Sequence, residues 1–87
     1  MADKMFVIIK ISPKDMDKLD ELEAQIKKIK NGEVKDIKRE PIGFGVEIIK
    51  VGILINEKEE GALERLKNEI DKIDLAENAE IEGMTLI

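Results

Sequence analysis

The sequence predicts an α+β fold in which a four-stranded antiparallel sheet carries two helices on one face. Two runs of β-branched apolar residues predict central strands. Two segments with apolar side chains every three or four residues predict amphipathic helices. Two charged segments complete the sheet as edge strands. With 87 residues the chain has the length of one domain, so we expect residues 1–87 to form a single domain.

The first strand and the first helix occupy the N-terminal third of the chain. Met5–Ile11 is a compact apolar run that Ser12-Pro13 ends, and its two apolar faces predict a central strand. The next segment has the pattern of an amphipathic helix, with apolar positions Met16, Leu19, Leu22, Ile26 and Ile29. Asp15 or Ser12 can cap its start, and Asn31-Gly32 is expected to end it in a left-handed conformation.

Two strands around a glycine-rich interruption are predicted in the middle of the chain. Val34–Glu40 is mostly charged, and Pro41, which cannot donate to a ladder, favours an edge position for this strand. Gly43-Phe44-Gly45 then interrupts the pattern. Val46–Ile55 is strongly apolar and suits the centre of the sheet.

A second helix and a closing strand are predicted for the C-terminal third. After a polar link at 56–61, the helix has apolar positions Leu63, Leu66, Ile70 and Ile73. Ala79–Leu86 closes the chain as a short, partly acidic edge strand. The order β-α-β-β-α-β is that of the ferredoxin-like sandwich, and right-handed crossovers place both helices on one face of the sheet. The open face is expected to present an apolar surface formed by Phe6, Ile8, Ile48 and Leu54.

Composition argues against several classes of function. The chain carries 15 basic and 20 acidic residues, a net charge of −5, which disfavours binding to nucleic-acid phosphates. It has no cysteine and no histidine, so it lacks thiolate nucleophiles, the commonest general base and the commonest metal ligand. Its apolar runs are too short to span a bilayer, and no signal-peptide pattern begins it. We therefore expect a cytoplasmic protein with no cofactor and no direct nucleic-acid or membrane partner.

The remaining candidates for covalent chemistry or metal binding are weak. Ser12, the one serine, lies beside a proline at a strand end, where capping is the usual role. Glu57, Glu59 and Glu60 could hold a hard cation, but they lack the alternating spacing of a calcium loop, which favours a solvated acidic loop. The sequence therefore predicts a binding protein and not an enzyme.

Gly43-Phe44-Gly45 admits several interpretations. It can be a bulge or a bend, because glycine tolerates positive φ. A phosphate cradle lacks the helix N-terminus that would orient its amides, and an RNA-binding strand would need a second ring and a nearby basic residue. Phe44 can also be a partly buried core ring. Finally, an aromatic between two glycines after Pro41 can project from a loop as an anchor for another protein.

The segment Glu40-Pro-Ile-Gly-Phe-Gly-Val46, followed by an apolar strand, resembles the signature of the guanine-exchange domain of elongation factor 1-beta. The acidic loop 56–61, the helix after it and the end Met84-Thr-Leu-Ile87 are similar to the layout of that family. The chain is similar to the archaeal members, which consist of this domain alone. The resemblance covers the whole length in pattern, and its specific part is the seven-residue segment and the C-terminal end.

This resemblance implies a protein partner and a site. Members of the family release GDP from elongation factor 1-alpha, the GTPase that carries aminoacyl-tRNA, and they make or break no covalent bond. The resemblance implies that Phe44 inserts into a hydrophobic pocket of the GTPase, that the flanking glycines allow close approach, and that the C-terminal end reaches toward the magnesium site. The partner-binding residues it implies are Pro41, Gly43, Phe44, Gly45, Leu86 and Ile87.

The chain departs from the pattern of the eukaryotic relatives in two ways. Those relatives have a penultimate lysine where this chain has Leu86, and a basic pair after Gly-Phe-Gly where this chain has Glu47 and Ile48. A cation that competes with magnesium is therefore not carried over to these positions. We expect instead steric wedging by the C-terminus, or an electrostatic role for another lysine such as Lys50.

A second hypothesis involves no GTPase. Ferredoxin-like domains also serve as regulatory or oligomerisation modules that bind a small molecule or a protein through the open sheet face. Concentration-dependent dimerisation without affinity for the GTPase would favour this alternative.

Overall fold

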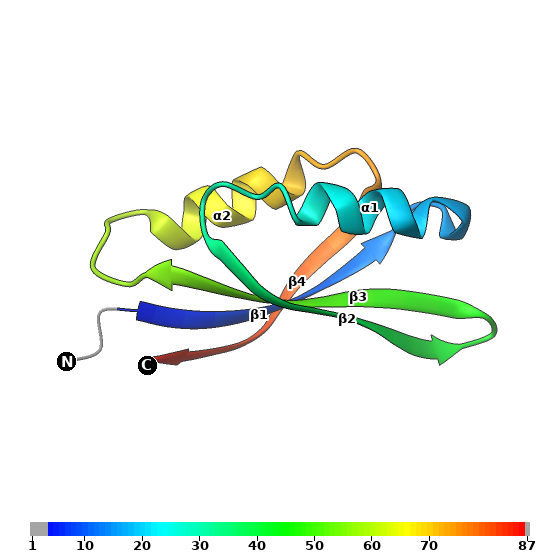
Figure 1. The fold of residues 1–87 in the computed structure, drawn as a ribbon, viewed down its shortest axis with the longest axis horizontal. Helices are drawn as coiled ribbons and strands as arrows, with labels where there is room; N and C mark the ends of the chain where they lie inside the picture. The colour runs from blue at the N-terminus through cyan, green and yellow to red at the C-terminus, as the bar shows by residue number, and fades with distance from the viewer. Residues whose placement is uncertain (1–3, 87) are drawn as a thin grey trace.

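A computed structural model describes residues 4–86 and shows a twisted four-stranded antiparallel sheet with two helices on one face (Figure 1). The elements are β1 (Lys4–Pro13), a short 3-10 helix η1 (Met16–Lys18), α1 (Leu19–Ile26), β2 (Glu33–Gly43), β3 (Val46–Asn56), α2 (Ala62–Asp71) and β4 (Ala76–Leu86). The strand order is β2-β3-β1-β4. The predicted fold class is confirmed, with the two apolar strands in the centre and the two charged strands at the edges.

The core lies between the sheet and the helices. Alternate residues of the two central strands are buried there, because neighbouring side chains of a strand point to opposite faces. One apolar stripe of each helix packs onto them. The core residues of these elements are Val7, Ile9 and Ile11 of β1, Ile49, Val51, Ile53 and Ile55 of β3, Leu19, Leu22 and Ile26 of α1, and Ala62, Leu66 and Ile70 of α2.

The first helical segment is shorter and more divided than predicted. The carboxylate of Asp15 accepts the backbone N–H of Asp17 at 2.9 Å and so caps η1, which leads directly into α1. The α-helix ends at Ile26, and hydrogen-bonded turns carry the chain on to the buried Ile29. Asp15 is therefore the cap, and Ser12 lies within β1.

Gly32 has a different role from the one expected. Its φ is not positive, so the predicted left-handed helix stop is wrong. A side chain at this position would collide with the Ile53 side chain in the core. Glycine is needed here because the chain passes close to β3, and not because the backbone needs a special conformation.

The loop between α1 and β2 is held by Glu69 of α2. Its carboxylate accepts the backbone N–H groups of Lys30 at 3.0 Å and Asn31 at 2.9 Å, and the Asn31 side-chain amide at 2.9 Å. Partial burial acts to raise the pKa of Glu69, but these hydrogen bonds outweigh it and hold the pKa below its ordinary value. One side chain thus joins the second helix to the loop that precedes the edge strand β2.

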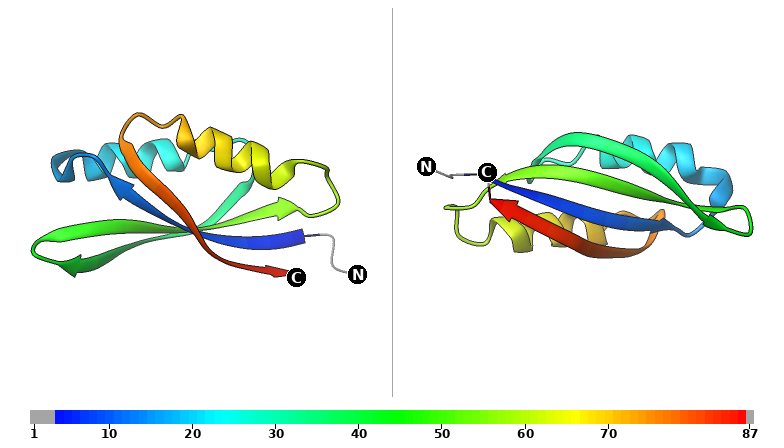
Figure 2. Two further views of the ribbon diagram at one scale, coloured as in Figure 1. Left: turned by 180° about the vertical axis from the view of Figure 1, so that it is seen from behind. Right: turned by 90° about the horizontal axis from the view of Figure 1, so that it is seen from below.

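No described helix covers the other face of the sheet, which the right-hand view of Figure 2 shows. The prediction of a bare apolar surface on this face is wrong. Ile48 is only 5% exposed, and Phe6, Ile8 and Leu54 are partly buried. The reason is local packing, since the Phe6 ring lies against Gly52, where a side chain would collide with it. Charged side chains of neighbouring strands share the face with these residues.

The molecule is elongated, with a longest dimension of 43 Å. The turn of the β2–β3 hairpin forms one end of the long axis, and the start of β1 and the end of β4 lie at the opposite end (Figure 1). Among residues 4–86, no helix is long and apolar enough to cross a membrane.

Candidate functional site

The Gly43-Phe44-Gly45 segment forms the tight turn of the β2–β3 hairpin. Gly43 pairs with Val46, so Phe44 and Gly45 are the two turn residues. Their φ values are 57° and 75°, both positive, as in the type I′ turn that matches the twist of antiparallel strands. Gly43 itself has a φ of 108°, which a residue with a side chain adopts only with strain. Among the interpretations of this segment, the bend is therefore confirmed.

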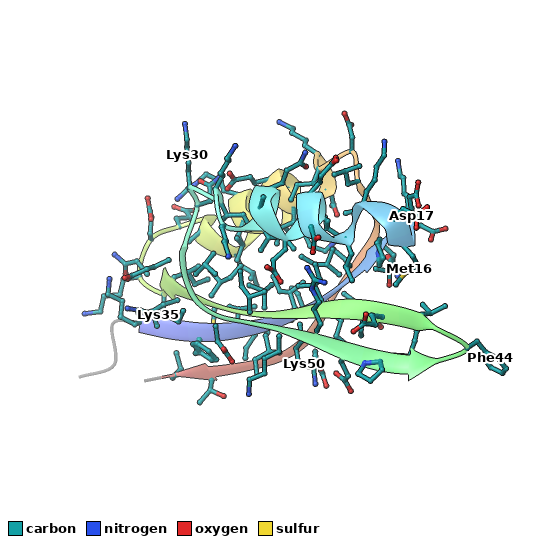
Figure 3. All side chains as sticks on the ribbon, turned by 45° about the vertical axis from the view of Figure 1, so that its right-hand side comes forward. Met16, Asp17, Lys30, Lys35, Phe44 and Lys50 are labelled. Atoms are coloured by element: carbon teal, nitrogen blue, oxygen red, sulfur yellow. The ribbon has the colours of Figure 1, made fainter. Side chains whose placement is uncertain are left out.

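Phe44 stands clear of the rest of the chain. Its side chain is fully exposed (106%) and points away from the molecule (Figure 3). The interpretation of Phe44 as a partly buried core ring is therefore wrong. Apart from its neighbours in the chain, a side chain added to Gly43 or Gly45 would meet no atom of residues 4–86 within 4 Å. The turn thus presents an isolated aromatic ring with open space around it.

This conformation is unfavourable for phenylalanine. A residue with a Cβ pays roughly 1–2 kcal/mol in the left-handed region, and the residues usual at this turn position are asparagine, aspartate and glycine. The ring gains no burial in return, because none of residues 4–86 covers it. A strained and exposed aromatic at a projecting tip is the pattern of a binding residue.

Two further apolar residues flank Phe44. Ile42 is 57% exposed and Val46 is 36% exposed. The register shifts between Pro41 and Gly43, so Ile42 is the extra residue of a β-bulge, a feature that re-aims a side chain. We call Ile42, Phe44 and Val46 the tip patch.

Phe44 was predicted from the sequence as a binding residue, but its two neighbours in the tip patch were not. A signal for them exists, because residues 41–46 carry no charge in a chain that is 40% charged. An uncharged apolar run at a hairpin turn has no core to enter. It therefore indicates a contact with another molecule.

Leu86 lies at the opposite end of the sheet from Phe44. It pairs with Met5, which in turn pairs with Ile55 near the end of β3. The length of β3 thus separates the two ends by about 30 Å. Leu86 is exposed, and Ile87 lies outside the described residues. Those of the implied residues that the structure describes therefore form two separate regions, with Pro41 and the turn at one end and Leu86 at the other.

Lys50 lies in the middle of β3 and points to the open face (Figure 3). Its Nζ is 3.1 Å from Glu40 Oε2 on β2 and 3.3 Å from Glu82 Oε2 on β4. The hydrogen bonds with Glu40 and then with Glu82 raise the pKa of Lys50, which remains fully cationic. Its charge is balanced within the fold, and it lies at neither end of the molecule.

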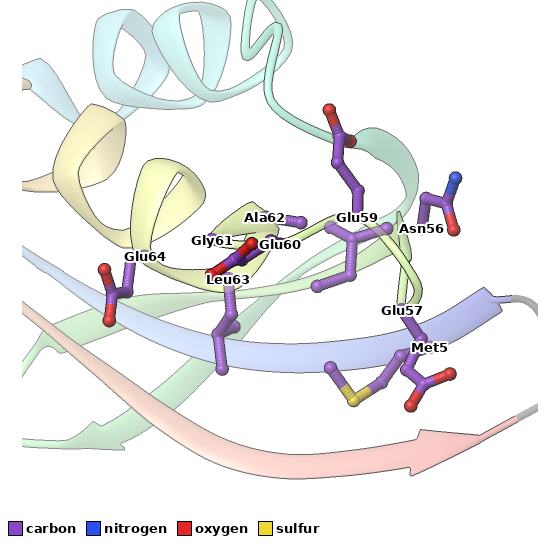
Figure 4. A pocket seen from close by; sticks show the side chains of 10 residues that line it. Met5, Asn56, Glu57, Glu59, Glu60, Gly61, Ala62, Leu63 and Glu64 are labelled. Atoms are coloured by element: carbon purple, nitrogen blue, oxygen red, sulfur yellow. The ribbon is translucent and has the colours of Figure 1, made fainter.

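The acidic loop after β3 borders a groove of about 330 Å³ (Figure 4). Met5 and Leu63 line its apolar side, and the glutamates of the loop line the other. Arg65 pairs with Glu59 at 2.8 Å. Within residues 4–86, no group of three or more acidic side chains is arranged to hold a metal ion.

Comparisons with known proteins agree with the sequence signature. A family model described as the EF-1 guanine nucleotide exchange domain matches residues 6–87. The chain is 37% identical over 82 residues to elongation factor 1-beta of Methanocorpusculum labreanum, and the match covers 93% of each chain. It is 33% identical over 87 residues to elongation factor 1-beta of Thermococcus gammatolerans, covering 95% of this chain and 94% of that one. The crystal structure of PH0061 superposes with a TM-score of 0.65 at 26% identity and covers 98% of this chain and 52% of that chain.

Proposed function

The chain belongs to the EF-1 guanine nucleotide exchange domain family, and on this premise we propose that it promotes GDP release and GTP reloading on elongation factor 1-alpha. This role belongs to translation elongation and implies a cytoplasmic location. An exchange factor shifts binding equilibria and makes no covalent bond, so the proposed role is not enzymatic in the chemical sense. The partner it requires is a protein.

The observation that best supports this proposal is the conformation of Phe44. The chain keeps an aromatic ring fully exposed in a strained turn, where neither burial nor backbone preference accounts for it. A buried pocket on the GTPase would remove that ring from water and recover its transfer free energy. Ile42 and Val46 would contact the rim of such a pocket.

The proposed mechanism is thermodynamic linkage between the factor and the nucleotide. If the factor binds the nucleotide-free GTPase more tightly than the GDP-bound form, bound factor must weaken GDP by the same ratio. We assign docking to the hairpin tip and disturbance of the magnesium and phosphate region to the C-terminal end. Leu86 is apolar, so this end would act by steric wedging and not by a charge that competes with magnesium.

The test is the release of a fluorescent GDP analogue from archaeal elongation factor 1-alpha. Phe44→Ala should raise the factor concentration needed for half-maximal acceleration by tens to several hundredfold, which corresponds to a loss of ~2–4 kcal/mol of docking energy. Lys35→Ala is the matched control, because Lys35 is an exposed residue of β2 away from the tip. Circular dichroism should show both variants folded.

Other outcomes would change the proposal in defined ways. Acceleration that is unaffected by Phe44→Ala would keep the function and move the docking site. No acceleration by the wild-type chain would overturn the function. A regulatory or oligomerisation module would then be the next hypothesis, tested by concentration-dependent dimerisation. Its main support is weakened here, because the open sheet face is less apolar than the sequence predicted.

A further inference from the structure

A single ammonium group connects the two edge strands of the sheet. Lys50 on β3 contacts Glu40 on β2, its neighbour in the sheet, and also Glu82 on β4. β3 and β4 are not neighbours, because β1 lies between them. The Lys50–Glu82 pair therefore crosses over β1, a distance of two strand spacings or about 10 Å.

Glu82 lies at a β-bulge of β4. Ile8 pairs with Gly83 and Ile9 pairs with Ile81, so Glu82 is the extra residue of β4. Glu82 keeps the alternation of the residues before it, since Ile81 packs against the core and Glu80 pairs with Lys10 on the open face. The extra residue thus supplies a carboxylate on the open face where Lys50 points.

The surroundings of Lys50 distinguish these two ion pairs from an isolated ion pair on an exposed surface. Its direct cross-strand partners are Lys10 on β1 and Lys38 on β2, so three lysines lie in one row. Like charges opposite one another destabilise a sheet. The two carboxylates offset this repulsion, and Lys50 is only 31% exposed between them. We call Glu40, Lys50 and Glu82 the clasp.

We propose that Lys50 is a positioning residue, and that the clasp fixes the orientation of the hairpin bearing Phe44 relative to the strand bearing Leu86. The functional part of this inference rests on the proposed exchange role, in which these two ends contact the GTPase. Glu40 is close in sequence to the hairpin tip, and Glu82 is close to the C-terminus. The clasp thus connects the strand segment that leads to Phe44 with the strand segment that leads to Leu86.

The clasp predicts a specific split between docking and release. Without it the sheet can change its twist, yet the tip patch at the end of the hairpin stays available. Phe44 would then still dock, but the C-terminal end would approach the nucleotide at the wrong angle. The maximal rate of GDP release should fall, while the factor concentration at half-maximal effect should change little.

The experiment compares four variants in the GDP-release assay. Lys50→Met keeps the length of the side chain without its charge, and Glu82→Gln removes the charge of the distant carboxylate. Both should lower the maximal release rate by about threefold to tenfold, with half-saturation within about twofold of wild type. Lys50→Arg should restore most of the rate. Lys38→Met, which removes a pair with Asp36 of its own strand and leaves the clasp intact, should behave as wild type.

Glu82→Gln separates this proposal from a direct electrostatic role of Lys50. If the Lys50 cation itself acted on the magnesium region, removing Glu82 would free that cation, and release would stay equal or become faster. That result would overturn the clasp. Slowing by Lys50→Met that Lys50→Arg fails to restore would also contradict it.

A measurement on the free protein keeps the test independent of the GTPase. Residual dipolar couplings report the orientation of β4 relative to the β2–β3 hairpin in solution. The clasp predicts that this orientation changes or broadens in Lys50→Met and Glu82→Gln but not in Lys38→Met. An unchanged orientation would overturn the clasp even if the wild-type chain accelerates release. Absence of acceleration together with a changed orientation would instead sink only the exchange role.

Discussion

At the scale of single residues, Phe44 combines two unfavourable properties that selection for stability alone would remove. Its backbone lies in the left-handed region, and its ring is exposed to water. Stability and docking should therefore respond in opposite directions to the same substitution. Few positions in a small domain allow so direct a separation of the two.

Phe44→Asn should stabilise the fold and weaken docking. Asparagine followed by glycine is the preferred sequence of this turn, so the free energy of unfolding should rise by about 1 kcal/mol. Urea denaturation gives this quantity through the midpoint at an unchanged slope. In the GDP-release assay the variant should be as defective as Phe44→Ala.

Phe44→Ala is the control for this prediction, because alanine keeps the backbone penalty and removes the ring. It should not gain the stability of Phe44→Asn. An unfolding midpoint for Phe44→Asn at or below that of the wild type would show that the turn is not strained in solution.

At the scale of secondary-structure elements, the α1–β2 loop depends on one carboxylate from α2. Glu69→Gln weakens three hydrogen bonds that join these elements, since a neutral amide oxygen is a poorer acceptor than a carboxylate. We expect the free energy of unfolding to fall by roughly 1 kcal/mol near neutral pH. Urea denaturation measures it.

The same substitution predicts a dependence on pH. The pKa of Glu69 is lower in the folded chain than in the unfolded chain, so its contribution is present above the unfolded pKa. This contribution is lost as pH falls through the folded pKa. The stability difference between wild type and Glu69→Gln should therefore be largest at about pH 7 and shrink toward about pH 3. Glu77→Gln, an exposed control, should show a smaller difference at both pH values.

The sequence was sufficient to predict elements whose pattern is local. The central strands follow from β-branched runs, and the edge strands follow from charge and from Pro41, because these signals do not depend on the rest of the fold. The role of Gly32 could not be predicted correctly, since glycine is needed there because of the Ile53 side chain of β3, which lies far from Gly32 in the sequence. The open face was misjudged for the same reason, because the Phe6 ring packs onto Gly52 only once β1 and β3 are paired.

The candidate site divides in the same way. Phe44 could be found from its signature, because a turn is made by adjacent residues. The contacts of Lys50 could not, since Glu82 lies on β4, two strands away from β3 in the sheet. Contacts that cross a strand are therefore visible only in three dimensions.

At the scale of the whole molecule, the two proposed contacts lie at opposite ends of the sheet. This separation predicts distinct kinetic defects. Leu86→Ser should lower the maximal rate of GDP release with little effect on half-saturation, while Phe44→Ala should mainly raise half-saturation. Titration of the factor at fixed GTPase concentration measures both quantities.

Thr85→Ala is the matched control for the C-terminal end. Thr85 pairs with Phe6 and so lies on the other face of β4 from Leu86. The Thr85→Ala variant should accelerate GDP release from the GTPase at the wild-type rate. Equal defects from both C-terminal variants would point to a general requirement for β4 instead of a wedge.

The bulged, two-residue turn has a consequence for how the hairpin can change its length. One residue inserted into each arm would rotate the tip to the opposite side of the sheet, because side chains alternate with period two. Two residues inserted into each arm would preserve the facing and lengthen the hairpin by about 7 Å. The length of the hairpin can therefore change only in large steps. The distance from the sheet to Phe44 can change only in steps of two residues per arm if the ring is to keep its facing. A partner that requires a fixed distance between its two contacts therefore constrains the number of residues between Arg39 and Ile49 as strictly as it constrains the ring at the tip.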